Sequence, residues 1–163
     1  TQTAPAVQAD PAATRTPISL PPPFENTSWP VHGGIPSHDP QHLALSSGAL
    51  RRVWETDIGA GSSKDSFALS QPVLAGQSLA VMDATGLVSL LDAASGRVVW
   101  QKSLQPEHED KAVVSGGVAH GGETLFVATG YGETVALSAR DGKLAWRTPL
   151  PAPARSAPVL ADG

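Results

Sequence analysis

Short apolar runs separated by turn-forming residues make up the chain from about residue 70 onward. Between residues 70 and 104, these runs are three to seven residues long, and Gly, Asp or Ser stands in each break. Such runs, joined by turns of two to five residues, predict β-strands that pair in an antiparallel meander. The four expected strands are Pro72–Leu74, Ser78–Met82, Leu87–Leu91 and Arg97–Ser103.

The pattern returns after a fixed interval, because Trp54, Trp100 and Trp146 are separated by 46 residues in both intervals. The layout of Leu91–Trp100 recurs in Leu137–Trp146, so a second four-stranded unit is expected over residues 115–150. A period of this size indicates stacked repeat units instead of one ordinary core.

The repeat has two incomplete neighbours. Pro158-Val159-Leu160-Ala161 copies Pro72-Val73-Leu74-Ala75 residue for residue, so a further unit is expected to start over 156–163. Upstream, residues 49–58 carry the Trp54 strand motif without the three strands that should precede it. This orphan strand is expected to act as a latch that completes a blade formed at the other end of the chain.

Six positions define the repeat and are expected to be structural. Asp92 can cap the turn before the fourth strand through its carboxylate, and a glycine can adopt the left-handed conformation that closes a short loop. The tryptophan after each turn supplies aromatic bulk suited to a pleated surface. The six positions are Trp54, Asp92, Gly96, Trp100, Gly142 and Trp146.

A four-stranded meander repeated every 40 to 46 residues is the sequence form of a β-propeller blade. The fold class is therefore all-β, with two full blades at 70–104 and 115–150 and flanking strands. One blade cannot bury both faces, and a ring must close to cover the end blades. We therefore expect the N-terminal part of a longer protein, and expect an open piece to self-associate.

The first 48 residues have a different composition from the repeats. Residues 1–25 are rich in Pro and Ala and predict a disordered tether. Residues 26–48 are too rich in Pro and Gly for a regular element, so an ordered strap with buried Trp29, Leu43 and Leu45 is expected. The loop 59–66 lacks the glycine spacing and Gly-Lys-Ser/Thr ending of a phosphate loop.

Composition excludes several classes of function. The chain has no cysteine and a net charge of −4, without a basic cluster, so disulfides and a nucleic-acid partner are not expected. The spacing of His32, His38 and His42 matches no usual zinc frame. No nucleophile–base motif is present either, so we predict no catalytic residues, no cofactor and no bound metal.

The motif Leu91-Asp92-x-x-Ser95-Gly96-x-x-x-Trp100 resembles the repeat of PQQ-like (quinoprotein-type) β-propellers, and it does not resemble WD40 repeats. The resemblance implies that Trp100 and Trp146 are docking tryptophans between neighbouring blades. The order of Pro-rich tail, Trp29-Pro30-Val31-His32-Gly33-Gly34, orphan strand and blades is similar to that of BamB, in its alphaproteobacterial form.

The resemblance to BamB, a family of outer-membrane assembly lipoproteins, carries several implications. It implies an eight-bladed propeller and a non-catalytic scaffold at the periplasmic face of the outer membrane. There it would help a BamA-type insertase, and nascent outer-membrane proteins, during β-barrel folding. Membrane association would depend on a lipid anchor that is implied and not present in this sequence.

Two other readings stay open at this stage. One is a PQQ-dependent dehydrogenase fragment that uses the quinone and calcium, because a fold does not fix a function. The absence of Cys, and of an Asp, Glu and Asn cluster, argues against it. The other is a generic periplasmic binding propeller, which the sequence does not distinguish from an assembly scaffold.

Overall fold

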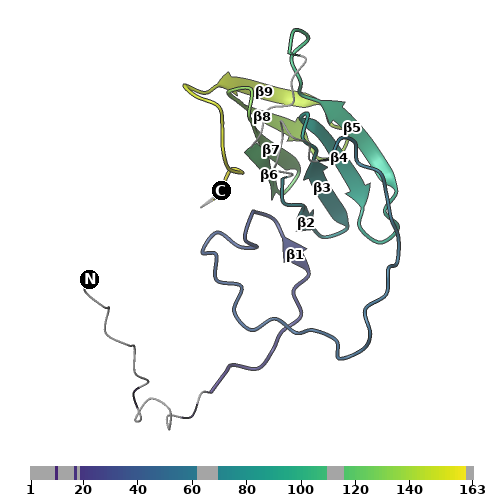
Figure 1. Ribbon diagram of the computed structural model, residues 1–163, viewed down its shortest axis with the longest axis vertical. Helices are drawn as coiled ribbons and strands as arrows, with labels where there is room; N and C mark the ends of the chain where they lie inside the picture. The colour runs from purple at the N-terminus through teal and green to yellow at the C-terminus, as the bar shows by residue number, and fades with distance from the viewer. Residues whose placement is uncertain (1–9, 11–16, 18, 62–69, 110–115, 161–163) are drawn as a thin grey trace, which may run out of the picture.

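The computed structural model describes Asp10, Pro17 and residues 19–61, 70–109 and 116–160. These residues form nine β-strands in two antiparallel sheets and no helix (Figure 1). The described part of the chain accordingly contains no helix long and apolar enough to cross a membrane. The all-β fold predicted from the sequence is confirmed.

The first sheet has the order β1-β2-β3-β4-β5 and the second the order β6-β7-β8-β9. We call β2–β5 blade one and β6–β9 blade two. Each blade is a meander in which every strand pairs with the next one along the chain. The strands are β1 Ser28–Trp29, β2 Val73–Ala75, β3 Ser78–Met82, β4 Leu87–Asp92, β5 Val98–Ser103, β6 Gly116–Gly121, β7 Thr124–Thr129, β8 Glu133–Ser138 and β9 Leu144–Pro149.

The two blades are built alike down to their irregularities. β8 and β9 begin and end 46 residues after β4 and β5. The register of the outer strand pair shifts between Leu90 and Leu91 in blade one, and between Ala136 and Leu137 in blade two. A bulge of this kind bends the strand and increases its twist. The repeat seen in the sequence is therefore a repeat of three-dimensional structure.

One apolar core lies between the blades and belongs to both of them. Its side chains alternate along the inner strands, as half-buried strands require, and each fully buried Val or Leu stabilises the fold by about 1.5–3 kcal/mol. Trp100 and Ala139 pack against this core from its margin. Its buried members are Val73, Ala80, Met82, Val88, Leu90, Leu104, Val118, Leu125, Val127, Val135 and Leu137.

The two sheets are arranged as wedges. Strand β6 of blade two contacts β2 and β3 of blade one, whereas β5 contacts only β4 and β9 contacts only β8 among the described strands. The blades therefore converge at the edges formed by β2 and β6 and diverge toward β5 and β9 (Figure 1). In a closed ring, the converging edges face the central axis.

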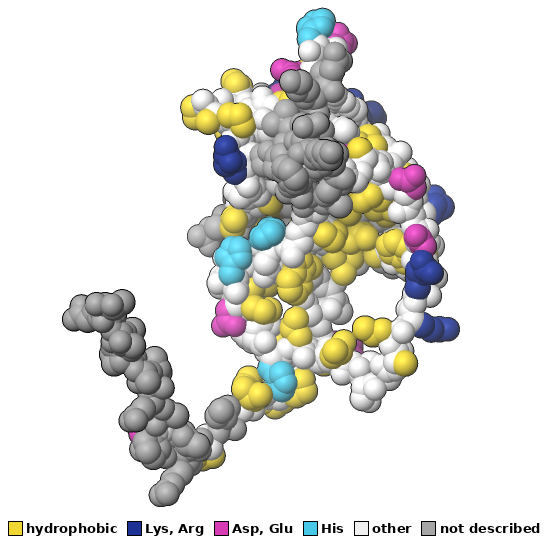
Figure 2. Space-filling view, in the orientation of Figure 1, with side chains coloured by type: hydrophobic (Ala, Val, Ile, Leu, Met, Phe, Trp, Pro, Cys, Tyr) yellow, Lys and Arg dark blue, Asp and Glu magenta, His cyan; other side chains and the backbone are white. Residues whose placement is uncertain are grey.

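The strap differs from its prediction in two respects. It contains a short regular element, because β1 pairs with β2 at Ser28–Ala75 and Trp29–Leu74. Leu45 was expected to be buried and is 82% exposed, since the chain after Ala44 leaves the body of the protein. Figure 2 shows an opening between this connecting segment and the blades.

The expected latch over 49–58 is not a strand in the structure, and no strand is formed within 156–160. Residues 53–58 alternate between exposed and half-buried side chains, as an extended chain does when one face is docked. Without a neighbouring strand, this segment has no ladder to join. Most of the expected tether over 1–25 and loop over 59–66 lies outside the described residues, as do residues 161–163.

Candidate functional site

Two tryptophans dock on the blade that follows them, in the same way. The indole Nε1 of Trp54 donates a hydrogen bond to the carbonyl oxygen of Ala93 over 3.0 Å. The indole Nε1 of Trp100 donates to the carbonyl oxygen of Ala139, also over 3.0 Å. Both bonds span 39 residues, so the two contacts are copies of one tryptophan–turn contact.

Each of these indole rings lies over a glycine of the same turn. A Cβ on Gly96 would come within 2.5 Å of the Trp54 ring, and a Cβ on Gly142 within 2.8 Å of the Trp100 ring. Both glycines also adopt a left-handed backbone, with φ of 71° and 69°. These positions need glycine because of the turn and because of the ring above it.

Side chains of the turn itself fix its shape. The Asp92 carboxylate accepts hydrogen bonds from the Ser95 amide at 2.8 Å and from the Ser95 hydroxyl at 2.5 Å. These bonds hold the pKa of Asp92 below its usual value. In blade two, the ion pair with Lys143 lowers the pKa of Asp141 to about 2 and raises the pKa of Lys143.

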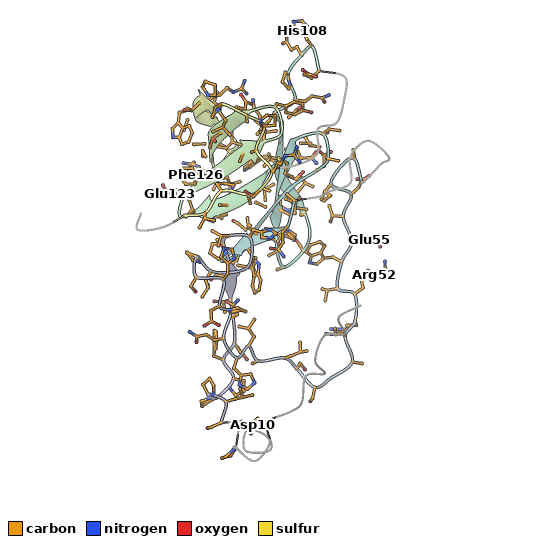
Figure 3. All side chains as sticks on the ribbon, turned by 60° about the vertical axis from the view of Figure 1, so that its left-hand side comes forward. Asp10, Arg52, Glu55, His108, Glu123 and Phe126 are labelled. Carbon is orange, nitrogen blue, oxygen red and sulfur yellow. The ribbon has the colours of Figure 1, made fainter. Side chains whose placement is uncertain are left out.

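Trp146 occupies the equivalent position on β9 without a turn beneath it among the described residues. Its side chain is 44% exposed and Leu144 beside it is 49% exposed. The Trp146 ring instead lies 6.1 Å from the ring of Phe126, at 46°. Phe126 is labelled on this outer face of blade two in Figure 3. The sequence repeat therefore places three tryptophans alike, and the structure shows the docked contact for two of them.

Asp83 is a buried carboxylate that the sequence analysis did not single out. Its side chain is 4% exposed. It accepts hydrogen bonds at 2.8 Å from the backbone amides of Ala60, Thr85 and Leu87 and from the Thr85 hydroxyl. It thereby joins the connecting segment to the β3–β4 turn. The Asp-Ala-Thr-Gly sequence is a turn signal that could have identified it.

The two blades are also joined through a tyrosine. The Tyr131 hydroxyl, in the β7–β8 turn, donates to the Thr85 carbonyl oxygen across the blade junction at 3.0 Å. Burial raises the pKa of Tyr131, and the carboxylates of Glu109 and Asp83 contribute in the same direction. Tyr131 therefore serves as a neutral hydrogen-bond donor in this junction.

His120 is a second buried polar side chain that the sequence analysis missed. It is 6% exposed, and neither ring nitrogen has a hydrogen-bond partner. Burial lowers its pKa, because the charged imidazolium is disfavoured away from water. The matching position of blade one, 46 residues earlier, is Leu74. His120 therefore replaces an apolar residue of the repeat.

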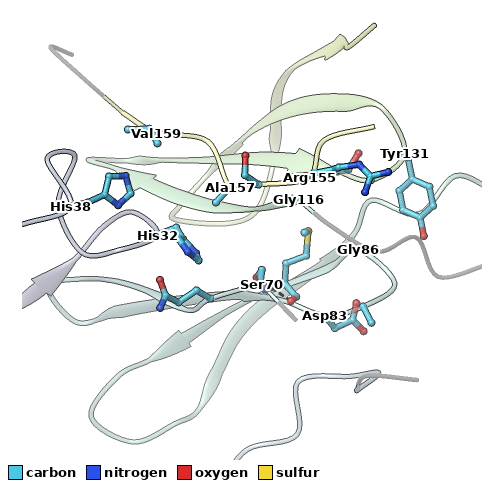
Figure 4. A pocket seen from close by; sticks show the side chains of 16 residues that line it. His32, His38, Ser70, Asp83, Gly86, Gly116, Tyr131, Arg155, Ala157 and Val159 are labelled. Carbon is cyan, nitrogen blue, oxygen red and sulfur yellow. Dashed lines mark hydrogen bonds between the residues drawn. The ribbon is translucent and has the colours of Figure 1, made fainter. Parts of the chain in front are cut away.

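A cavity of about 530 Å³ lies between the strap, the two blades and the segment after β9 (Figure 4). The strap contributes His32 and His38, blade one contributes Asp83, and blade two contributes Tyr131. Arg155 enters from the segment that follows β9. The Asp83 carboxylate already accepts four hydrogen bonds within the fold. Its role is therefore to hold the turn, and its oxygens are already engaged there.

Two of the three strap histidines make separate contacts, and His32 lines the cavity. The His42 Nδ1 atom lies 2.6 Å from the carbonyl oxygen of Pro21, and the His38 ring lies over Gly33. Across the described residues, no group of three or more His, Cys, Asp or Glu side chains is placed to hold a metal ion. The structure does not bring His32, His38 and His42 together as ligands.

The fold is shared with large propeller enzymes. The structure superimposes on quinohemoprotein alcohol dehydrogenase from Comamonas testosteroni with a TM-score of 0.59 at 19% identity, covering 76% of this chain and 19% of that chain. It superimposes on a europium-containing methanol dehydrogenase with a TM-score of 0.63 at 19% identity, covering 83% of this chain and 26% of that one. The blades therefore have a β-propeller fold, and likeness at this identity shows the fold alone.

Sequence relatives define the family more closely. The profile of the family described as outer membrane protein assembly factor BamB matches residues 41–109 and 84–163. BamB from Yersinia pestis is 34% identical over 117 residues, which are 69% of this chain and 30% of that protein. BamB from Escherichia coli is 32% identical over 112 residues, 66% of this chain and 28% of that protein.

The chain belongs to the BamB family. It spans about 30% of the length of the curated relatives that it matches.

Proposed function

We propose that this chain is part of a non-catalytic scaffold that helps β-barrel proteins fold and insert at the periplasmic face of the outer membrane. The observation that supports this proposal is the family match across residues 41–163, whose named relatives are outer membrane protein assembly factors. The activity is proposed for the whole protein, because the chain spans less than a third of its relatives.

The use of polar side chains in the described core also supports a scaffold. Four buried side chains are polar: Asp83, Ser89, His120 and Thr129. Asp83 holds a turn, and the Ser89 hydroxyl accepts a hydrogen bond from Gln101 at 3.0 Å. These two side chains stabilise the blades through hydrogen bonds. This use fits a scaffold, which needs a rigid surface more than a reactive group.

The proposed partners are proteins: a BamA-type insertase and nascent outer-membrane proteins. The proposed attachment to the membrane is a lipid anchor, joined to the propeller through the Pro- and Ala-rich residues 1–25. With a net charge of −4 and no basic cluster, the chain offers nothing to attract anionic phosphate backbones.

We also propose that residues 49–58 form the outer strand of a blade that closes the ring. Trp54 docks on blade one as Trp100 docks on blade two, so the segment stands where an outer strand of a preceding blade would stand. Thr56 strengthens this joint, because its hydroxyl donates to the Gly96 carbonyl oxygen at 2.6 Å. The eight-bladed ring implied by the family resemblance would supply the missing strands.

Deletion of the natural gene, combined with affinity capture, tests the proposed function. We expect deletion to lower the amount of folded β-barrel protein in the outer membrane. We also expect the tagged natural protein to capture a BamA-type insertase from detergent-solubilised membranes. Normal barrel assembly in the deletion strain, together with no captured insertase, would contradict the proposal.

An enzymatic assay separates the proposal from the dehydrogenase reading. The purified natural protein is incubated with PQQ, calcium and a primary alcohol, and reduction of an artificial electron acceptor is followed. We expect no reduction above the protein-free rate. Quinone-dependent reduction would assign the protein to the dehydrogenases.

A further inference from the structure

The strap is a closed loop pinned to both blades. Its two ends meet where the Phe24 amide donates to the His42 carbonyl oxygen at 3.1 Å and the Ala44 amide donates to the Phe24 carbonyl oxygen at 2.8 Å. This pair of bonds closes residues 24–44 into a loop that contains most of the strap. A loop fixed at its neck retains a defined shape without a helix or a long strand.

The strap runs along the converging edge of blade one. Strand β1 pairs with β2 through Ser28–Ala75 and Trp29–Leu74, and the Gly33 amide donates to the Gln71 side-chain oxygen at 2.9 Å. It therefore follows this edge from Ala75 at one end to Gln71 at the other. Strand β1 lies beyond β2, on the side away from β5 (Figure 1).

The same strap reaches the converging edge of blade two. The His120 amide in β6 donates to the Pro30 carbonyl oxygen at 2.7 Å. Next to this bond, Val31 is 1% exposed, which makes it the most deeply buried apolar side chain of the strap. One short segment thus contacts the edges of two blades that face the same axis.

We propose that the strap is an internal plug that occupies the central channel of the propeller. A fifth strand on the inner edge of a blade reaches about 4.8 Å farther toward the axis than a four-stranded blade does. The cavity of about 530 Å³ beneath the strap is then the space that remains in this part of the channel. Figure 4 shows His32 and His38 of the strap on one side of it and Arg155 on another.

The plug has two consequences for binding. It satisfies backbone groups on the inner edges, which would otherwise be open to pairing with another chain. It also keeps large solutes out of the channel, so macromolecular partners bind to the outer surfaces of the ring. The inference rests on ring closure and is independent of the assembly function proposed above.

Cysteine labelling in the longest natural chain that contains these residues tests the plug. Residues 1–163 contain no cysteine, and any cysteine elsewhere in the natural chain is first replaced by serine, so that an introduced thiol gives a single signal. Leu74→Cys places the thiol next to Trp29 of the strap, in the strand that pairs with β1, and Ser95→Cys places a matched thiol in an exposed turn. We expect a 5-kDa maleimide-polyethylene glycol to label the Leu74→Cys protein at least tenfold more slowly.

Two variants release the strap by different routes. Val31→Asp buries a charge under the strap, and Gly34→Ala adds a Cβ at φ 98° that lies 3.2 Å from the Trp29 ring. Each is expected to raise the labelling rate at Leu74→Cys at least tenfold and to leave the rate at Ser95→Cys unchanged. If Val31→Asp raises the labelling rate of both thiols because the blades unfold, the strap is tested with Gly34→Ala instead.

Hydrogen exchange gives a second readout that needs no thiol. The His120 amide is expected to exchange at least tenfold faster after strap release, because it loses the Pro30 acceptor. The Val135 amide in β8 serves as the reference and is expected to keep its rate. Equal labelling of Leu74→Cys and Ser95→Cys with the strap intact overturns the plug. An unchanged exchange rate of the His120 amide in the Gly34→Ala protein also overturns the plug.

Discussion

The indole nitrogen of Trp100 donates to the carbonyl oxygen of Ala139, and this bond joins the outer strand of one blade to the last turn of the next. Trp54 and Ala93 make the same bond one repeat earlier. A joint that recurs at a separation of 39 residues is a property of the repeat, so its strength can be measured at any one copy.

Truncating the docking tryptophan should weaken the blade junction. Because Trp100 is half-buried against the core and hydrogen-bonded, we expect Trp100→Ala to lower the free energy of unfolding by about 2–4 kcal/mol. Trp100→Phe keeps most of the apolar contact and loses only the Nε1 bond, so a loss of about 1 kcal/mol is expected. Urea unfolding followed by circular dichroism measures both values.

Trp146 provides the matched control within the same repeat. In this chain its side chain is 44% exposed, so Trp146→Ala should cost less than about 1 kcal/mol. In a natural chain that supplies a further blade, we expect the same substitution to cost as much as Trp100→Ala. Equal losses from Trp100→Ala and Trp146→Ala in the 163-residue chain would be evidence against the joint described here.

The glycine beneath the indole ring should tolerate no side chain. Gly142→Ala combines a left-handed φ of 69° with a Cβ 2.8 Å from the Trp100 ring, so we expect a loss of about 2–4 kcal/mol. Gly76→Ala is the control, since φ is 58° and no atom lies within 4 Å of the added Cβ. It should cost about 1 kcal/mol. Urea unfolding that finds the two variants equally stable would rule out the steric part of this explanation.

The buried carboxylate of Asp83 should contribute more than the exposed carboxylate of the repeat turn. Asp83→Asn replaces an acceptor oxygen by an NH₂ group that faces backbone amides, and we expect a loss of about 2–3 kcal/mol. Asp92→Asn, at an exposed turn, should cost clearly less. Differential scanning calorimetry of the two variants compares them, and a smaller loss for Asp83→Asn would show that these hydrogen bonds contribute little.

Stability should fall in mildly acidic solution because of His120. Burial lowers its pKa in the folded protein, whereas the unfolded chain titrates near the ordinary value of about 6.5. As the pH falls through that value, the unfolded state takes up a proton that the folded state does not. The free energy of unfolding therefore decreases until the pH reaches the lowered pKa of the folded state.

His120→Leu is the control for this pH dependence, because it restores the residue type found at Leu74 in blade one. Urea midpoints are measured between pH 8 and pH 5 for both proteins. The wild type should lose more stability than His120→Leu over this range. Parallel curves would assign the acid sensitivity to groups other than His120.

Local features of the fold could be predicted from the sequence, and features that depend on distant pairing could not. The strands of both blades follow from alternating apolar runs and from glycine turns such as the one at Gly96, which act over a few residues. The pairing of Ser28 with Ala75 gives no local signal, because a two-residue strand has no period of its own. Leu45 likewise has an apolar side chain, yet it is largely exposed in the described part of the chain.

The residues of the candidate site divide in the same way. Five of the six repeat positions, the three tryptophans and the two glycines, stood out because they recur, and Asp92 stood out as a turn former. Asp83 and His120, by contrast, are polar residues whose counterparts differ. Position 129, the counterpart of Asp83, is a threonine, and position 74, the counterpart of His120, is a leucine. A comparison of the two blades, position by position, could have identified both residues, because each is a polar residue whose counterpart is of another type.

The core shared by the two blades also has a consequence for the order of events during synthesis. The apolar side chains Val88 and Leu90 of blade one belong to one core with Val135 and Leu137 of blade two. The chain is made at about 5–20 residues per second, so the interval of 46 residues takes about 2–9 seconds. For that time, blade one presents an uncovered apolar face, which blade two then covers. Blade one is therefore prone to aggregation until blade two has been made.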